Sequence, residues 1–255
     1  MKVIIGGALG RMGRELKQAA PAFGVDIVCG VDVAYQGQVM EYPIVRTYAE
    51  IAVDADALID FSRADGLPDL LAYGIKASMP LVLCTTGYSE QEVATIEAAA
   101  KQIPIFRSAN MSFGINVLQK LVDMATRVLG DHFDVEIIEK HHNQKLDSPS
   151  GTALMLYDTV NNARDGESTV VNGRSGRAAA RTKAEVGVHA VRGGTVTGEH
   201  EVGFYGVAEE IILTHRAENR SLFAQGALRA AIFLAGKPAG LYAMQNMVNE
   251  AFDAQ

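Results

Sequence analysis

The sequence predicts an α/β protein: a doubly wound parallel sheet, followed by a second, α+β domain that contains an open mixed sheet. Three observations predict it. Over residues 1–112, short apolar runs alternate with helical segments, which is the pattern of a parallel sheet covered by helices. A glycine-rich turn follows the first apolar run directly. After a long helical segment, strand-like runs succeed one another with turn signals between them, which indicates a separate sheet.

The first domain is expected to alternate strands and helices in chain order. Apolar runs bounded by glycine, proline or polar residues place the strands at residues 2–5, 26–31, 57–61, 81–84 and 105–107. The helices are expected at residues 15–20, 67–77 and 90–101. The first helix stops at Pro21, and the third opens with Ser89 and Glu92 in the spacing of a capping box.

The turn after the first strand has the features of a dinucleotide-binding site. Strand, glycine turn, helix, strand and acid follow in the order of the Rossmann βαβ unit, and Asp32 is placed to accept hydrogen bonds from ribose hydroxyls. The glycines form G-x-x-G-x-x-G with Leu9 at the usual middle position, so a structural turn explains the pattern alone about as well. The candidate cofactor residues here are Gly7, Ala8, Leu9, Gly10, Arg11, Met12 and Asp32.

Three further turns lie at the carboxyl ends of predicted parallel strands, where ligands bind in open α/β sheets. Taken alone, each is better explained as a capped turn between a strand and a helix. The residues in question are Phe61, Cys84, Thr85, Thr86, Ala109, Asn110, Met111 and Ser112.

The second domain is expected over residues 113–222, with residues 223–255 returning to the first. The expected helices are 113–129, 150–162, 221–235 and 241–252, and the expected strands are 135–140, 186–191, 195–204 and 210–215. The last three strands are expected to be antiparallel, with turns at Gly193-Gly194 and Tyr205-Gly206. Residues 163–185 lack a clear period and predict a mobile loop, whose arginines at 174, 177 and 181 are solvated or, alternatively, form a lid.

The loop after strand 135–140 combines features that suit a small dicarboxylate. The helix start near Gly151 offers backbone N–H groups to an anion, and Lys145 adds a full positive charge. His141 or His142 can exchange a proton near neutral pH. A plain polar connection is an alternative. A metal site is less favoured, because adjacent strand residues His141 and His142 point to opposite faces.

This stretch also resembles the signature of the dihydrodipicolinate reductase family, the 4-hydroxy-tetrahydrodipicolinate reductases of lysine and diaminopimelate biosynthesis. The matching residues are Glu136, Glu139, His141, His142, Lys145, Asp147 and the run 149–153. The family shares the G-x-x-G-R-M-G form of the glycine turn. The sequence departs from the family at Cys84, where glycine is frequent, and at Met111, where phenylalanine is common.

The resemblance implies reduction of (2S,4S)-4-hydroxy-2,3,4,5-tetrahydrodipicolinate by NADH or NADPH, in a cleft between the two domains. It implies that His141 is the acid/base residue and Lys145 the proton donor. It places His142, Gly151 and Thr152, with Ser150 as a helping cap, on the substrate carboxylates. It also places the nicotinamide half of the cofactor along the three turns above, and implies a homotetramer built through the second sheet. No metal is expected.

Composition excludes several other classes. The 30 acidic residues outnumber the 23 basic ones, which argues against nucleic acid or an anionic membrane as partner. No apolar run approaches the ~18 residues of a membrane span. Two cysteines, Cys29 and Cys84, are too few for a disulfide framework, so we expect reduced thiols and a cytoplasmic protein.

Cofactor preference has one indication in the sequence. Asp32 is followed by Val33 and Ala34 rather than by a cation, so it should repel the 2′-phosphate of NADPH, with Arg11 compensating in part. We therefore expect NADH to serve at least as well as NADPH. Two rivals to the reductase interpretation remain: another two-domain dehydrogenase, and a non-catalytic nicotinamide sensor in which Lys145 is idle.

Overall fold

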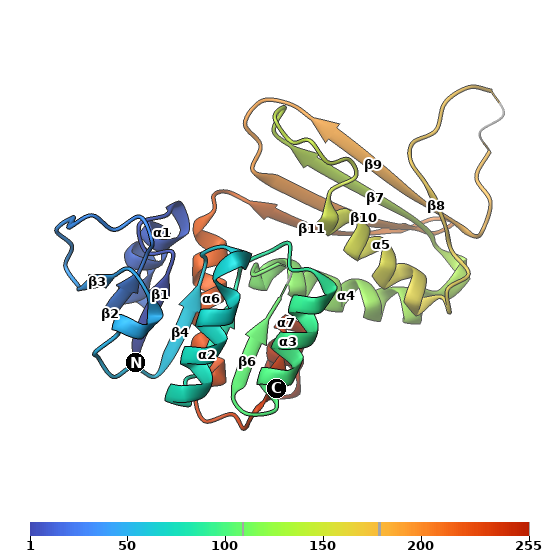
Figure 1. Cartoon of the computed structure of the whole chain (residues 1–255). Coiled ribbons are helices and arrows are strands. Elements are labelled where there is room, and N and C mark those ends of the chain that lie inside the picture. Colours follow the sequence, from blue (N-terminus) through green and yellow to red (C-terminus); the bar gives the residue numbers. More distant parts are fainter. Residues whose placement is uncertain (109, 178–179, 255) are drawn as a thin grey trace. The chain divides into compact units, whose positions relative to one another are not determined.

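The structure is a computed structural model that describes residues 1–108, 110–177 and 180–254. The chain divides into two compact units, Met1–Phe113 with Arg220–Gln255, and Gly114–Asn219 (Figure 1). Because the chain leaves the first unit after Phe113 and returns at Arg220, the first unit is built from two separate segments.

The first unit contains a seven-stranded parallel sheet in the order β12-β6-β5-β4-β1-β2-β3. Its strands are β1 (Lys2–Gly6), β2 (Asp26–Val31), β3 (Ile44–Val45), β4 (Ala57–Asp60), β5 (Leu81–Leu83), β6 (Pro104–Arg107) and β12 (Gly240–Tyr242). The helices are α1 (Arg11–Ala19), α2 (Leu67–Ala77), α3 (Glu90–Ala100), α6 (Ser221–Leu234) and α7 (Met244–Asp253), with short 3-10 turns at Ala20–Phe23, Tyr48–Glu50 and Ala64–Gly66.

Helices cover both faces of this sheet, which confirms the doubly wound prediction. Successive side chains of a strand point to opposite faces, and β1 shows this directly. Val3 and Ile5 pack in the cluster that contains Leu16 of α1. Ile4 packs in the cluster that contains Leu70 of α2. All three β1 side chains are fully buried, so this strand is the centre of the unit's core.

Two strands at the edges of the sheet were not predicted. Leu241 and Tyr242 were expected to begin the last helix but belong to β12, which pairs in parallel with β6, and only Met244–Asp253 is helix. Ile44–Val45 forms β3 beside β2. Both are two or three residues long, and their hydrogen-bond partners lie elsewhere in the chain, so local periodicity carries little sign of them.

The second unit contains a five-stranded mixed sheet in the order β11-β10-β7-β9-β8, as the predicted fold class requires. Its strands are β7 (Asp134–His141), β8 (Thr169–Val171), β9 (Glu185–Arg192), β10 (Gly198–Tyr205) and β11 (Glu210–Ala217). Two helices, α4 (Phe113–Leu129) and α5 (Gly151–Ala163), pack against one face through Leu118 and Leu156, and Gly130–His132 is a 3-10 turn. Burial alternates along β7, so its odd-numbered residues point toward these helices.

The predicted hairpin at Gly193-Gly194 was wrong. β9 pairs in parallel with β7, and β7 lies between β9 and β10, so the glycine turn carries the chain past the end of β7 rather than joining neighbours. The second turn does join the antiparallel neighbours β10 and β11, as predicted. Turn residues indicate that the chain reverses direction, but they do not indicate that a third strand, here β7, lies between the two strands that the turn connects.

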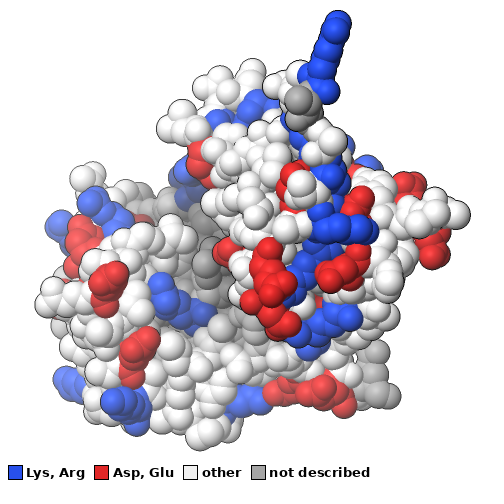
Figure 2. Space-filling model, turned by 90° about the vertical axis from the view of Figure 1, so that its right-hand side faces the viewer, with Lys and Arg blue, Asp and Glu red and all other residues white. Residues whose placement is uncertain are grey.

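The described residues of the 163–185 segment, 163–177 and 180–185, contain more regular structure than the predicted loop. They contain β8, and two of their arginines are ion-paired rather than solvated. Arg174 contacts Glu136 at 2.9 Å, and Arg181 contacts Asp134 at 2.8 Å and Glu136 at 3.1 Å. Arg177 is exposed as predicted. On the face drawn in Figure 2, the described basic and acidic side chains lie interspersed rather than forming one broad field of a single sign.

Among the described residues, no helix is both long enough and apolar enough to cross a membrane.

Candidate active site

A charged loop joins β7 to α5 and carries most of the predicted substrate residues. His141 is the last residue of β7, and α5 begins at Gly151. The Ser150 hydroxyl accepts the backbone N–H of Ala153 at 3.1 Å, so the helix start predicted from Ser-Gly-Thr is present. The loop is therefore held between a strand end and a capped helix end.

His141 is oriented by a buried carboxylate. Glu139 lies on the same face of β7, is fully buried, and accepts a hydrogen bond from Nδ1 of His141 at 2.6 Å. Arg192, at the end of β9, donates to both Glu139 oxygens at 2.7 and 2.8 Å. Burial alone would raise the pKa of Glu139, but the hydrogen bonds from Arg192, His141 and the Ser150 N–H hold it below its ordinary value.

This contact fixes which nitrogen of His141 is available. An ionised Glu139 can only accept, so Nδ1 carries the proton and Nε2 is the nitrogen left for other partners. A Cβ on Gly198 would come within 3.2 Å of that Nε2, so the glycine leaves room beside it. The arrangement suits proton exchange or charge stabilisation at Nε2.

A second histidine supports the helix start. His200, on β10, is buried, and its Nε2 lies 3.0 Å from the Ser150 hydroxyl. Burial, and after it the neighbouring His141, lowers the pKa of His200 to about 4, so the ring is neutral at neutral pH. The Ser150 hydroxyl accepts the Ala153 N–H and has one proton of its own, which it can donate to Nε2 of the neutral His200 ring.

The anion-binding groups of the loop already hold a carboxylate. The Asp147 carboxylate lies 2.8 Å from Nζ of Lys145, four residues before α5 begins at Gly151. The Lys145 ammonium is the main cause that lowers the pKa of the Asp147 carboxyl, and the backbone N–H groups of Asp147 and Gly151 contribute less. An ammonium close to a helix N-terminus in the chain thus binds a carboxylate, which is the chemistry predicted for the substrate.

The other predicted substrate residues lie on the same loop. His142 is half-buried, and its carbonyl accepts the Lys145 N–H at 3.2 Å, which folds the loop back on itself. Thr152 is half-buried in the first turn of α5. A Cβ on Gly151 would meet no described atom within 4 Å, so this helix start is open to an approaching molecule.

The first unit contains the predicted nucleotide turn. Gly7 has φ +72°, a backbone conformation that strongly favours glycine, and a Cβ on Gly13 would come within 2.4 Å of the Ala8 carbonyl oxygen. Asp32 lies at the end of β2, where Oδ2 accepts the Leu9 N–H at 2.9 Å and Oδ1 accepts the Ala34 N–H at 2.9 Å. The close packing at these glycines and the hydrogen bonds between Asp32 and the turn fit a dinucleotide-binding site, in which the backbone of the turn contacts the pyrophosphate.

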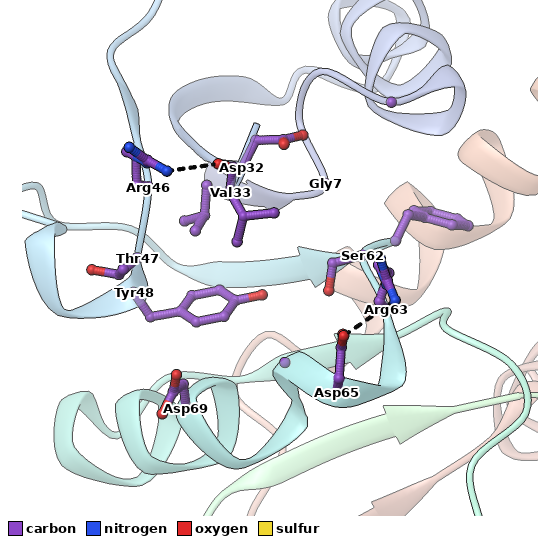
Figure 3. A pocket seen from close by; sticks show the side chains of 14 residues that line it. Gly7, Asp32, Val33, Arg46, Thr47, Tyr48, Ser62, Arg63, Asp65 and Asp69 are labelled. Carbon is purple, nitrogen blue, oxygen red and sulfur yellow. Dashed lines mark hydrogen bonds and ion pairs between the residues drawn. The ribbon is translucent and has the colours of Figure 1, made fainter. Parts of the chain in front are cut away.

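A cavity of about 290 Å³ opens beside this turn (Figure 3). It is lined by Gly7, Gly10, Val31, Asp32, Val33, Arg46, Thr47, Tyr48, Phe61, Ser62, Arg63, Asp65, Gly66 and Asp69. Two of the predicted cofactor turns, the glycine turn and the one at Phe61, therefore line one cavity. Its combination of apolar walls and a carboxylate at the rim suits a nucleoside.

The remaining candidates divide into accessible and buried positions. Thr85 is half-buried and donates to the buried Asp60 at 2.9 Å, while Thr86 is exposed. The Ser112 N–H binds the Asn110 side chain at 2.9 Å. Cys84 and Met111, the two departures from the family pattern, are both buried, so their side chains belong to the core. Ala109 lies outside the described residues.

Three residues that the structure brings to these sites had no role assigned to them from the sequence. Arg192 and His200 come from strands far along the chain from Glu139 and Ser150, and Arg46 comes from an unpredicted strand end. The first two belong to the Arg-Gly-Gly and Gly-Glu-His stretches that resemble the family, which was the available signal. For Arg46 the sequence contained no such signal.

Comparison with known proteins identifies the family of this chain. Models of the N-terminal and C-terminal parts of dihydrodipicolinate reductase match residues 1–111 and 114–248. The chain belongs to the dihydrodipicolinate reductase family. The resemblance seen in the sequence is thereby confirmed, and the chain is an oxidoreductase of this family.

Full-length relatives give the same assignment. A 4-hydroxy-tetrahydrodipicolinate reductase of Clostridium tetani (strain Massachusetts / E88) is 45% identical over 250 residues, which are 98% of this chain and 97% of that protein. One of Clostridium novyi (strain NT) is 44% identical over 248 residues, which are 97% of this chain and 98% of that protein. Members of the family thus align with this chain nearly from end to end.

Solved structures support the fold. A dipicolinate-bound dihydrodipicolinate reductase from Paenisporosarcina sp. TG-14 is similar with a TM-score of 0.79 at 21% identity, covering 97% of this chain and 99% of that one. A probable dehydrogenase from Thermotoga maritima is similar with a TM-score of 0.61 at 12% identity, covering 98% and 93%. At these identities the likeness concerns the fold alone.

Proposed function

We propose that this chain reduces (2S,4S)-4-hydroxy-2,3,4,5-tetrahydrodipicolinate to (S)-2,3,4,5-tetrahydrodipicolinate and water with NADH or NADPH, in lysine biosynthesis via diaminopimelate. The observation that carries the proposal is the Asp147 carboxylate paired with Lys145 at 2.8 Å, just before the start of α5 at Gly151. A substrate carboxylate needs the same donors, so Asp147 marks where one end of a dicarboxylate binds. The C. tetani and C. novyi relatives carry the name of this activity.

Each residue has a defined task in this proposal. His142, Ser150, Gly151 and Thr152 hold the substrate carboxylates at the start of α5. Lys145 leaves Asp147 when substrate arrives and donates the proton that the reduction requires. His141, oriented by Glu139, takes part in acid/base exchange through Nε2.

The nicotinamide cofactor supplies the hydride when it is bound, and the first unit is proposed as its domain. The glycine turn would hold the pyrophosphate through Gly7, Ala8, Leu9, Gly10, Arg11 and Met12, and Asp32 the ribose. The turns at Phe61, Cys84–Thr86 and 109–112 would border the nicotinamide half, with Cys84 and Met111 contributing backbone, since their side chains are buried.

One rival mechanism fits poorly. A dehydrogenase that acts on an aldehyde through a covalent intermediate needs an accessible cysteine thiolate. Cys29 and Cys84 are both buried, and burial raises the pKa of each thiol. We also propose, in line with two free thiols, that the protein works in the cytoplasm.

The cofactor proposal is tested by a coupled assay with the enzyme that forms the unstable substrate. Oxidation of NADH and of NADPH is followed separately, and we expect kcat/KM for NADH to be at least equal to that for NADPH. A tenfold preference for NADPH, which is about 1.4 kcal/mol of transition-state free energy, would contradict this expectation. Oxidation of neither cofactor in the presence of substrate would contradict the proposed activity itself.

We further propose that the second unit mediates a homotetramer. Both helices of this unit pack on one face of its sheet, and the other face carries Ile212, which is 40% exposed and lies opposite Gly203 of β10. An open sheet face with exposed apolar residues is a suitable surface for a second copy.

Light scattering after gel filtration tests this. We expect wild type to have the mass of four 27.3 kDa chains, and Ile212→Asp to shift it to a smaller species. Val207→Asp is the control, because Val207 is fully exposed in the turn between β10 and β11. A monomeric wild type, or a variant that remains tetrameric, contradicts the proposal.

A further inference from the structure

Two opposite charges stand side by side at the rim of the nucleotide cavity. β2 and β3 are parallel, with Val31 opposite Val45, and the Asp32 N–H donates to the Val45 carbonyl at 2.9 Å. Arg46, the residue that directly follows β3, therefore lies beside Asp32 at the same end of the sheet. Figure 3 shows both side chains at the cavity, with the Arg46 guanidinium directed toward the backbone of Val33.

The two charged side chains, Asp32 and Arg46, differ in the hydrogen bonds and ion pairs that they already form. Both carboxylate oxygens of Asp32 accept backbone N–H groups, which fixes this acid in place at the turn. Within the described residues, the Arg46 guanidinium forms no ion pair, and it donates to the Val33 carbonyl over a long 3.4 Å. Arg63, another arginine of this cavity, is paired with Asp65 at 3.3 Å. Arg46 is thus the cation of this cavity that can turn to a new anion.

The chain after β2 provides no cation of its own. In the dinucleotide fold, an acid after the second strand binds the ribose 2′-hydroxyl, and a 2′-phosphate needs an arginine near it. Val33 and Ala34 follow Asp32, and Val33 is 73% exposed without contributing charge. A 2′-phosphate placed here would face the Asp32 carboxylate with no compensation from β2.

We propose that Arg46, which directly follows the neighbouring strand β3, is the residue that admits the 2′-phosphate of NADPH. Its planar guanidinium can bind a phosphate through two parallel hydrogen bonds, which offsets the repulsion from Asp32. NADH lacks this phosphate and makes no such contact. The inference rests on the proposed use of a nicotinamide cofactor, and it makes Arg46 the residue that sets the ratio between NADPH and NADH.

The test measures cofactor binding without turnover. The fluorescence of bound NADPH and NADH gives a Kd for each in wild type and in Arg46→Gln. We expect the Kd for NADPH to rise about tenfold, which is ~1.4 kcal/mol, and the Kd for NADH to change less than twofold. Arg63→Gln, the matched control in the same cavity, should leave the ratio of the two Kd values unchanged.

A rescue variant separates a specific contact from a general loss of charge. Val33→Arg in the Arg46→Gln background returns a cation next to Asp32, and we expect it to recover most of the lost NADPH affinity. Equal weakening of both cofactors in Arg46→Gln, or no weakening of either, overturns the inference while the proposed function stands. Failure of wild type to bind both NADH and NADPH overturns the proposed function instead.

Discussion

Replacing Lys145 by alanine should lower kcat at least 100-fold while the protein still binds NADH with its wild-type affinity. The side chain is only 21% exposed and contacts the Asp147 carboxylate at 2.8 Å, so its ammonium is already placed against the kind of group the substrate presents. Proton donation by a positioned side chain is worth about 10²- to 10⁴-fold in rate, and alanine cannot provide it.

The measurement combines the coupled assay for kcat with NADH fluorescence for Kd. Lys183→Ala is the control, because Lys183 belongs to the same unit but donates to the Asp131 carbonyl on an exposed surface. We expect that control to keep both kcat and Kd. If Lys145→Ala retains wild-type kcat, the loop is idle, and the alternative of a non-catalytic nicotinamide sensor is favoured.

Replacing Glu139 by glutamine should reduce both activity and stability. The carboxylate accepts from four donors: two from Arg192, one from His141 and one from the Ser150 N–H. The glutamine side chain has the same shape, but an NH₂ group replaces one of the two accepting oxygens. This NH₂ group would then face N–H donors, to which it cannot bond. The Arg192 charge also loses its buried partner, which costs about 3 kcal/mol in comparable cases.

The kinetic effect of Glu139→Gln should fall on kcat rather than on KM. Glu139 contacts the ring of His141 through Oε2 and the backbone N–H of Ser150 through Oε1. The Ser150 hydroxyl keeps its own contact with the Ala153 N–H, so the role of Glu139 in catalysis is to hold the tautomer and orientation of the His141 ring. We expect kcat to fall about 100-fold with KM changed less than threefold. Equal losses in both parameters, or wild-type kcat, would contradict a positioning role. Glu92→Gln, at the capping box of α3, is the control and should leave kcat unchanged.

The stability effect of Glu139→Gln should depend on pH in a defined direction. Because the folded protein holds the pKa of Glu139 below its ordinary value of 4.5, the carboxylate contributes its stability above that pH. The contribution is lost as the pH falls through the lowered pKa. Urea unfolding should therefore show a difference between wild type and variant that is full at pH 7 and shrinks below pH 4.5. A difference that is independent of pH would contradict this assignment.

The fold class was predictable because it depends on local patterns repeated many times. Residues 2–5 and 26–31 read as buried strands from their composition alone, and the glycine turn between them requires its glycines for steric reasons that act over a few residues. The short edge strands β3 and β12 and the parallel placement of β9 were not predictable in this way. They are decided by partners elsewhere in the chain.

By itself the sequence determined the family, the doubly wound domain and the loop that carries His141, Lys145 and the Ser150–Thr152 helix start, because these features are made by residues adjacent in the chain. Only the tertiary structure decided which distant side chains form hydrogen bonds at the two ends of that loop. Arg192 reaches Glu139 across 53 positions of the chain, and His200 reaches Ser150 across 50. Hydrogen bonds between distant residues form only when a sheet brings their strands together, so no local pattern records them.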